Sequence, residues 1–110
     1  MKIHKLQDMI RGWFIGDFEP SVLRTKGFEV GVLTHKKGEY WAEHYHKIAT
    51  EINILLKGDM SVNGIHISEG DIFVLEPNET AAPVFHEDCI VLCVKTPSVI
   101  GDKYSVGDTP

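Results

Sequence analysis

The sequence predicts an all-β protein, and two observations carry this prediction. Short apolar stretches that alternate with polar residues recur along the chain, and a turn signal separates them about every ten residues. No stretch shows the long 3.6-residue periodicity of an amphipathic helix. This combination is typical of a sandwich or barrel of short strands. We expect a single domain over residues 1–110, with a barrel core at about residues 28–96 between short N- and C-terminal arms.

Each expected strand is apolar or alternating and is bounded by Gly, Pro, Asn or Asp. The expected strands are 13–15, 28–35, 39–46, 51–56, 60–62, 65–67, 72–75, 81–85 and 89–95. The clearest turn is Asn63-Gly64, because Asn-Gly between alternating apolar residues favours a two-residue hairpin turn with positive φ at both positions. We expect residues 1–12 to form a short helical turn or an arm, and residues 98–110 to form an irregular arm.

Composition narrows the function classes. The formal net charge is −5, and no Lys/Arg cluster is present to neutralise phosphates, so we expect no nucleic-acid partner. No segment is apolar enough to span a membrane, and the N-terminus lacks the apolar core of a signal peptide, so a cytoplasmic location is expected. Cys89 and Cys93 fall on one face of one strand, too far apart to bridge, and are expected to stay reduced.

The stretch from Gly38 to Gly58 carries the candidate chemistry. In an extended strand, His44 and His46 project from the same face. Glu51 follows a short connection, and a chain that turns back there can bring it to the same space. Two imidazoles and one carboxylate suit Fe(II), Mn(II), Ni(II) or Zn(II) and leave open positions for substrate or water. We therefore predict a divalent transition metal held by His44, His46 and Glu51.

Further candidates follow from the same alternation. Tyr40 and Ala42 share the parity of the two histidines, and Asn53 shares that of Glu51. We name Tyr40, Asn53 and His86 as candidates for proton transfer or substrate orientation. Asn53 has the competing interpretation of a satisfied buried amide, and His86 that of a turn residue near the barrel mouth. The inner-face positions assigned in this way hold no Lys or Arg, which favours a small uncharged or carboxylate-bearing substrate.

The spacing of the glycines and the three candidate ligands resembles the first motif of the cupin family. Five residues separate Gly38 from His44, one separates His44 from His46, four separate His46 from Glu51, and six separate Glu51 from Gly58. The resemblance implies a small jelly-roll β-barrel, the double-stranded β-helix. It also implies that the two histidines and the glutamate are metal ligands on its inner wall. Small cupins commonly dimerise, and Trp13-Phe14-Ile15 would suit such an interface, so we expect a homodimer.

The second cupin motif is only half present. Gly70-Asp71 and the following strand resemble its start, and Pro77 falls one residue later than usual. Ala82 then occupies the position of the usual fourth ligand, a histidine, and cannot ligate a metal. His86 could replace it only if a bulge near Pro83 shortened the path. A three-ligand site remains chemically adequate, but the metal cannot be named.

Three functions are compatible with these residues. The first is a metal-dependent isomerase, lyase or dioxygenase that acts on a small polar metabolite inside the barrel. The second is a non-enzymatic barrel that binds or senses a small ligand or metal. The third is a metal-free epimerase or isomerase of nucleotide-linked sugars, with His44 or His46 as base and Tyr40 as acid. The third needs cations for a diphosphate, and only Arg11, Arg24, Lys36 and Lys37 are expected near the barrel.

Overall fold

The protein is almost entirely β-structure, as expected. A computed structural model describes residues 1–106, and its only helical element is the short 3-10 helix η1, Leu6–Asp8. The strands of this part of the chain are β1 Trp13–Ile15, β2 Glu29–His35, β3 His44–Tyr45, β4 Thr50–Lys57, β5 Met60–Val62, β6 Ile65–Ile67, β7 Ile72–Leu75, β8 Pro83–Phe85, β9 Cys89–Thr96 and β10 Tyr104–Ser105. No helix in residues 1–106 is long and apolar enough to cross a membrane.

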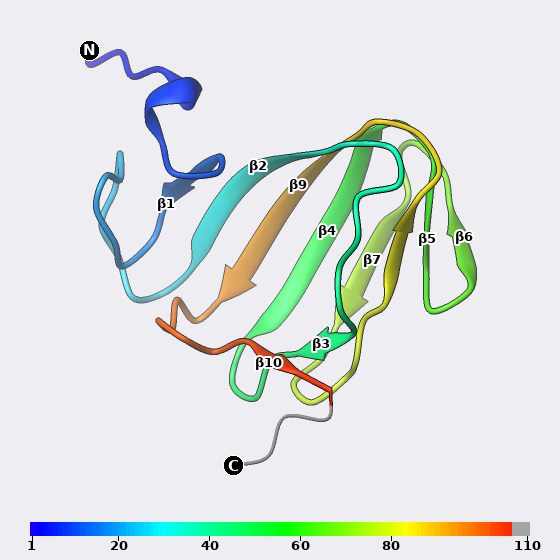
Figure 1. Ribbon diagram of the computed structural model, residues 1–110. Coiled ribbons are helices and arrows are strands. Elements are labelled where there is room, and N and C mark those ends of the chain that lie inside the picture. Colours follow the sequence, from blue (N-terminus) through cyan, green and yellow to red (C-terminus); the bar gives the residue numbers. More distant parts are fainter. Residues whose placement is uncertain (107–110) are drawn as a thin grey trace.

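The strands form two facing layers (Figure 1). One layer is an antiparallel five-stranded sheet in the order β1-β2-β9-β4-β7. The facing layer is made of a three-stranded sheet, β6-β5-β8, and the two-stranded pair β10-β3. The two layers join through long crossovers rather than hairpins alone, which is the jelly-roll arrangement that limits exposed sheet edges.

The core lies between the layers at the closed end of the barrel. Alternate residues of β4 and β9 point inward, and Leu55 and Cys93 are fully buried there. The apolar residues buried in this core are Leu55, Met60, Val62, Ile67, Leu75, Ala81, Phe85, Cys89 and Val91. Both cysteines are free and buried, which confirms the expected absence of a bridge between them. The cytoplasmic location stays a prediction.

Two expectations about the chain's path were wrong. Only His44–Tyr45 of the expected strand 39–46 pairs as a strand, and residues 39–43 follow an irregular course. The C-terminal arm is not irregular throughout, because Tyr104–Ser105 pairs antiparallel with β3. Residues 107–110 of that arm lie outside the described residues. The expected hairpin is confirmed, with Asn63 and Gly64 at φ 54° and 77° between β5 and β6.

Candidate functional site

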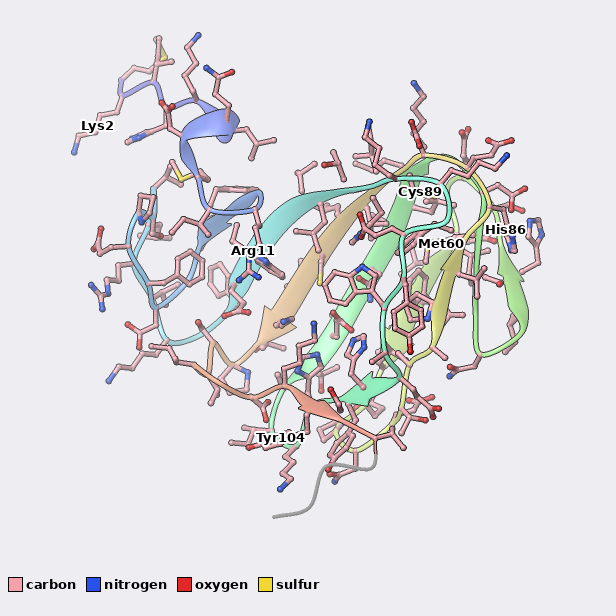
Figure 2. All side chains as sticks on the ribbon, viewed as in Figure 1. Lys2, Arg11, Met60, His86, Cys89 and Tyr104 are labelled. Atoms are coloured by element: carbon pink, nitrogen blue, oxygen red, sulfur yellow. The ribbon has the colours of Figure 1, made fainter. Side chains whose placement is uncertain are left out.

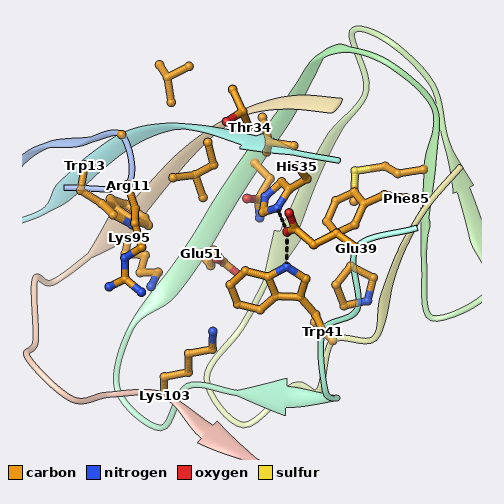
Figure 3. A pocket seen from close by; sticks show the side chains of 18 of the residues that line it. Arg11, Trp13, Thr34, His35, Glu39, Trp41, Glu51, Phe85, Lys95 and Lys103 are labelled. Atoms are coloured by element: carbon orange, nitrogen blue, oxygen red, sulfur yellow. Dashed lines mark hydrogen bonds and ion pairs between the residues drawn. The ribbon is translucent and has the colours of Figure 1, made fainter. Parts of the chain in front are cut away.

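A cavity of about 1000 Å³ opens between the two layers (Figure 3). The five-stranded sheet forms one wall, and we call it the sheet wall. On the opposite side lie residues of the three-stranded sheet and its approach, among them Met60 and Phe85, and the segments 36–49 and 101–106, which we call the loop wall. His44 and His46 line the cavity from the loop wall, and Glu51 lines it from β4. The three candidate ligands therefore face one space.

The two histidines are oriented by backbone carbonyls. Nδ1 of His44 lies 3.1 Å from the carbonyl oxygen of Ala42, and Nδ1 of His46 contacts the carbonyl oxygen of Asp102. A carbonyl can only accept, so each Nδ1 carries a proton, and in the neutral ring Nε2 is the nitrogen with the lone pair. The ring centroids lie 5.9 Å apart in an edge-on arrangement. Burial lowers the pKa of His44, which favours the neutral imidazole that binds metals.

Glu51 is held on the sheet wall by a thiol. Sγ of Cys93, on the neighbouring strand β9, donates to Oε1 of Glu51 at 3.3 Å. Burial is the largest cause that raises the pKa of Cys93, and the negative charge of Glu51 adds to it. The thiol therefore stays protonated and remains a donor. This contact leaves the rest of the carboxylate available to the cavity.

The donor set fits a divalent transition metal by chemistry, since two neutral Nε2 atoms and a carboxylate are ligands that such ions prefer. Their arrangement is open. Within residues 1–106, no group of three or more His, Cys, Asp or Glu side chains is arranged closely enough to hold a metal ion. Binding at His44, His46 and Glu51 would therefore require their side chains to draw together.

A polar network that the sequence did not predict joins the two walls near the barrel's closed end. Oε2 of Glu39 lies 2.6 Å from Nδ1 of His35 and accepts the indole N–H of Trp41, also at 2.6 Å. Desolvation alone would raise the pKa of Glu39, but these donors outweigh it and lower that pKa. His35 stacks on Phe85 with ring centroids 4.3 Å apart. His35 is thereby held in place through Nδ1.

Asp102 fastens the C-terminal segment to the loop wall. Its carboxylate accepts the backbone N–H groups of residues 47, 48 and 49, and the shortest contacts are 2.9 Å. Desolvation alone would raise the pKa of Asp102, but the three donors outweigh it and the pKa is lowered. The same residue's carbonyl holds His46. Asp102 therefore fixes both the turn after β3 and one candidate ligand.

Four cations line the cavity, although the inner-face positions assigned from the sequence hold no Lys or Arg: Lys5 at the exposed N-terminal segment, and Arg11, Lys95 and Lys103. Arg11 comes from the turn before β1, Lys95 from the end of β9, and Lys103 from the segment before β10. Figure 3 shows Arg11, Lys95 and Lys103 directed toward the space around Glu51. Desolvation is the largest cause that lowers the pKa of Lys103, and the charges of Lys95 and Arg11 lower it further.

The other predicted residues separate into two groups. Asn53 is 5% exposed and lines the cavity, so its inner-face placement is confirmed. Tyr40 is 86% exposed and lines only a shallow pocket outside the cavity, because the irregular course of residues 39–43 breaks the alternation on which its placement rested. His86 is exposed, with Nε2 3.2 Å from Oγ of Ser61, and does not line the cavity. Figure 2 shows His86 and Arg11 on opposite sides of the barrel.

Ala82 offers no substitute ligand at the missing position. Its backbone N–H donates to Oδ1 of Asn63 at 2.8 Å, which ties β8 to the β5–β6 hairpin.

The other expected cations lie elsewhere: Arg24 pairs with Asp17 and Glu19 on the surface. Lys95 was within reach of sequence reasoning, because it continues the inward alternation of the two cysteines on β9. Arg11 and Lys103 lie in irregular segments, where no two-residue alternation predicts the direction of a side chain.

Known structures share this fold. No protein-family model and no curated protein matches the sequence. A conserved protein with a double-stranded β-helix domain from Klebsiella pneumoniae matches with a TM-score of 0.70 and 21% identity, over 97% of this chain and 93% of that one. The DMSP lyase DddQ from Ruegeria pomeroyi matches with a TM-score of 0.69 and 17% identity, over 84% of this chain and 48% of that one. A cupin-2 domain protein from Shewanella frigidimarina matches with a TM-score of 0.55 and 14% identity, over 66% of this chain and 72% of that one.

Proposed function

We propose, from the premise that this chain has the fold of a small cupin, that it is a metal-dependent enzyme acting on a small polar metabolite inside the barrel. The observation that carries this proposal is the placement of His44, His46 and Glu51 around one cavity, with both histidines held through Nδ1 so that Nε2 can ligate. A lyase among proteins of similar fold is consistent with it. Isomerase and dioxygenase chemistry remain compatible, because fold does not decide function.

His44, His46 and Glu51 would hold a divalent transition metal. When bound, such an ion supplies Lewis-acid polarisation of a substrate oxygen. His35 is the proposed proton acceptor, because Glu39 holds its Nδ1 and leaves Nε2 available. Asn53 can orient the substrate, since its amide is buried on the cavity wall. Together these residues suit a reaction that begins with proton abstraction next to a polarised carbonyl.

The structure bears differently on the two alternative functions, a non-enzymatic binding barrel and a metal-free epimerase. A non-enzymatic barrel would use the same cavity and ligands, and an activity assay separates it from an enzyme. The metal-free epimerase requires a tyrosine acid beside a histidine base, and Tyr40 lies outside the cavity. The cavity does contain cations that a phosphorylated substrate would need. The missing acid is therefore the reason why we prefer the metal-dependent function.

Metal content tests the proposal. The protein would be purified without chelators or nickel columns, and its metals would be quantified beside the variants His44→Ala and Glu51→Ala. We expect about one equivalent of a transition metal per wild-type chain and its loss in both variants. His66→Ala is the matched control, because His66 is exposed and pairs with Asp59 away from the cavity. Cobalt absorption after reconstitution gives a readout independent of activity. A wild type that takes up no metal would refute the proposal.

We also propose that the protein forms a homodimer. The solvent-facing side of the five-stranded sheet is rich in aliphatic side chains, a composition that favours burial against another surface. Its most exposed members are Ile52, Leu56, Ile72 and Val74. Light scattering after gel filtration gives the mass in solution, and Ile72→Lys is expected to shift a dimer to monomer. A monomeric wild type would contradict this prediction.

A further inference from the structure

Three of the cations that line the cavity, Arg11, Lys95 and Lys103, reach it from widely separated parts of the chain. Arg11 and Lys103 stand at the mouth, and the side chain of Lys95 is only 18% exposed deeper inside. All three belong to the lining of the same cavity as the candidate ligands. The described acidic residues that also line it are Glu39 and Glu51, and Glu39 is already engaged by His35 and Trp41. The cavity therefore has an excess of positive charge in an acidic protein.

The charges of these cations are compensated only in part, by Glu29 beside Lys95 and by Glu51, whose charge also acts on Lys103. Nζ of Lys103 lies 3.9 Å above the ring of Trp41, and Nζ of Lys95 lies 4.8 Å above that of Trp13. Lys95 also has a long ion pair, 3.6 Å, with Glu29. Within residues 1–106, neither Arg11 nor Lys103 forms an ion pair. The aromatic rings position the ammonium groups and leave their N–H donors available to a ligand.

Arg11 occupies a backbone conformation that ordinarily favours glycine. Its φ is 52°, and it forms a two-residue turn with Gly12, φ 86°, closed by Trp13 N–H donating to Ile10 C=O at 3.0 Å. The turn is fastened to the sheet wall, because the N–H of Val32 donates to the carbonyl of Gly12 at 3.0 Å. A non-glycine residue held in this conformation and directed into a cavity suggests a functional reason for its side chain.

We propose that Arg11, Lys95 and Lys103 bind the oxyanion group, carboxylate or phosphate, of a small metabolite. This inference builds on the function proposed above, because it assigns the substrate class of the same cavity. The planar guanidinium of Arg11 suits two-point contact with an oxyanion, and the two lysines add mobile point charges. An oxyanion among three cations also relieves their mutual repulsion. The remainder of the ligand then extends toward His35 and Glu51.

Binding of simple anions tests this inference directly. Wild-type protein, both chelator-treated and metal-reconstituted, would be titrated calorimetrically with succinate, with inorganic phosphate and with the neutral analogue succinamide. We expect succinate or phosphate to bind, with an affinity that falls as salt rises, and succinamide to bind roughly tenfold more weakly. The two anions distinguish a carboxylate from a phosphate ligand. Equal affinity for succinate and succinamide would overturn the proposal.

Four variants locate the binding groups. Lys103→Met, Lys95→Met and Arg11→Gly should each weaken anion binding by roughly tenfold. Lys57→Met is the matched control, since Lys57 is exposed at the end of β4 and does not line the cavity. Arg11→Gly is the most informative, because glycine accepts the positive φ and the fold should keep its melting temperature while losing affinity. Unchanged anion binding in all three cavity variants would contradict the proposal.

The outcomes separate this inference from the metal proposal. If the chelator-treated and metal-supplied proteins both bind succinate but neither takes up metal, the metal proposal fails and the oxyanion site stands. If metal binds and the cavity variants bind anions as the wild type does, the oxyanion site fails and the metal proposal stands. Metal content of Lys103→Met and Arg11→Gly should remain at the wild-type level, because neither residue belongs to the donor set.

Discussion

The two walls of the cavity are built by different means. On the sheet wall, β2, β9 and β4 are seven or eight residues long and pair in continuous antiparallel ladders. The loop wall contains only the two-residue strands β3 and β10. Its shape depends on isolated backbone hydrogen bonds, such as the pair between His44 and Ala81, and on two carboxylates, Glu39 and Asp102, which accept from neighbouring residues. Continuous ladders fix the first wall, and isolated backbone bonds and side chains fix the second.

This difference matters for function because the candidate groups are divided between the walls. Glu51 and Lys95 stand directly opposite each other in the ladder of the sheet wall. His44, His46 and Lys103 stand on the loop wall. A ligand set that must draw together on binding requires one adjustable side, and the loop wall, with few backbone ladder bonds, is that side. The sheet wall then serves as the fixed reference for the chemistry.

The largest expected difference between the walls concerns the two glycines that bound the motif. A Cβ at Gly58, φ 108°, would lie 2.4 Å from the carbonyl oxygen of Asp88, where the sheet wall ends. A Cβ at Gly38, φ 74°, would meet nothing within 4 Å. Gly58→Ala should therefore cost roughly 4 kcal/mol of unfolding free energy, and Gly38→Ala about 1 kcal/mol. Urea denaturation measures both.

The two alanine variants control each other, because both carry the penalty for positive φ and only one carries the clash. Equal losses of unfolding free energy in the two variants would mean that the packing around Gly58 adjusts to the added methyl group. The sheet wall would then not be rigid at this point. We expect metal content to survive in Gly38→Ala, since the site does not contact the added methyl group.

The second prediction removes a fastening of the loop wall. Asp102→Ala leaves three backbone N–H groups without their acceptor and should cost roughly 3 kcal/mol. Asp102→Asn keeps one acceptor oxygen of the same shape and should cost less. Both variants should bind metal more weakly than wild type, because the segment that holds His46 loosens. Full metal affinity in Asp102→Ala would show that His46 is positioned without this segment.

The pH dependence of stability, compared between wild type and Asp102→Asn, tests the role of the Asp102 charge separately. The pKa of Asp102 is lowered from its ordinary value of 3.8, so its carboxylate stabilises the fold above that value and this contribution is lost as the pH falls through the lowered pKa. The stability gap between wild type and Asp102→Asn should therefore be full at neutral pH. It should narrow as the pH falls below 3.8. A gap independent of pH would mean that the charge of Asp102 contributes nothing.

The same contrast explains what the sequence could predict. Alternation predicted β2, β4 and β9 nearly to the residue, because a ladder holds side chains to a strict two-residue period. It misplaced Tyr40, because residues 39–43 form no ladder and the period does not apply. It also missed β10, whose two residues carry no pattern. The all-β fold was therefore predictable, and the course of the loop wall was not.

The part of the candidate site that lies on regular strands could be predicted from the sequence, and the part on irregular segments could not. The inward placement of Glu51 and Asn53 is confirmed on the sheet wall, where alternation holds. Lys103 reaches the cavity through contacts between segments far apart in the chain, which no local pattern encodes. His35 occupies a predicted strand, but its pairing with Glu39 depends on the irregular turn between them. Whether the metal binds remains a prediction that its own experiment tests.

The third prediction concerns the other carboxylate of the loop wall. Glu39→Ala removes the oxygen that His35 and Trp41 share and should cost roughly 2 kcal/mol of unfolding free energy. In a Trp13→Phe background Trp41 is the only tryptophan, and its fluorescence should shift as the indole loses its acceptor. Glu43→Ala, at an exposed neighbour, is the control. Unchanged fluorescence would show that Glu39 does not position Trp41.

The smallest effect is expected at His86, which lies outside both walls. Its Nε2 contacts only Oγ of Ser61 at the surface, so His86→Ala should change the unfolding free energy by less than about 0.5 kcal/mol. Metal content and anion binding should match the wild type, because the side chain does not line the cavity. The contrary result, a loss of metal with the fold intact, would require the segment around Pro83 to bring His86 inward. It would restore His86 as the replacement for the ligand missing at Ala82, and the site would then draw on the three-stranded sheet as well as the two walls.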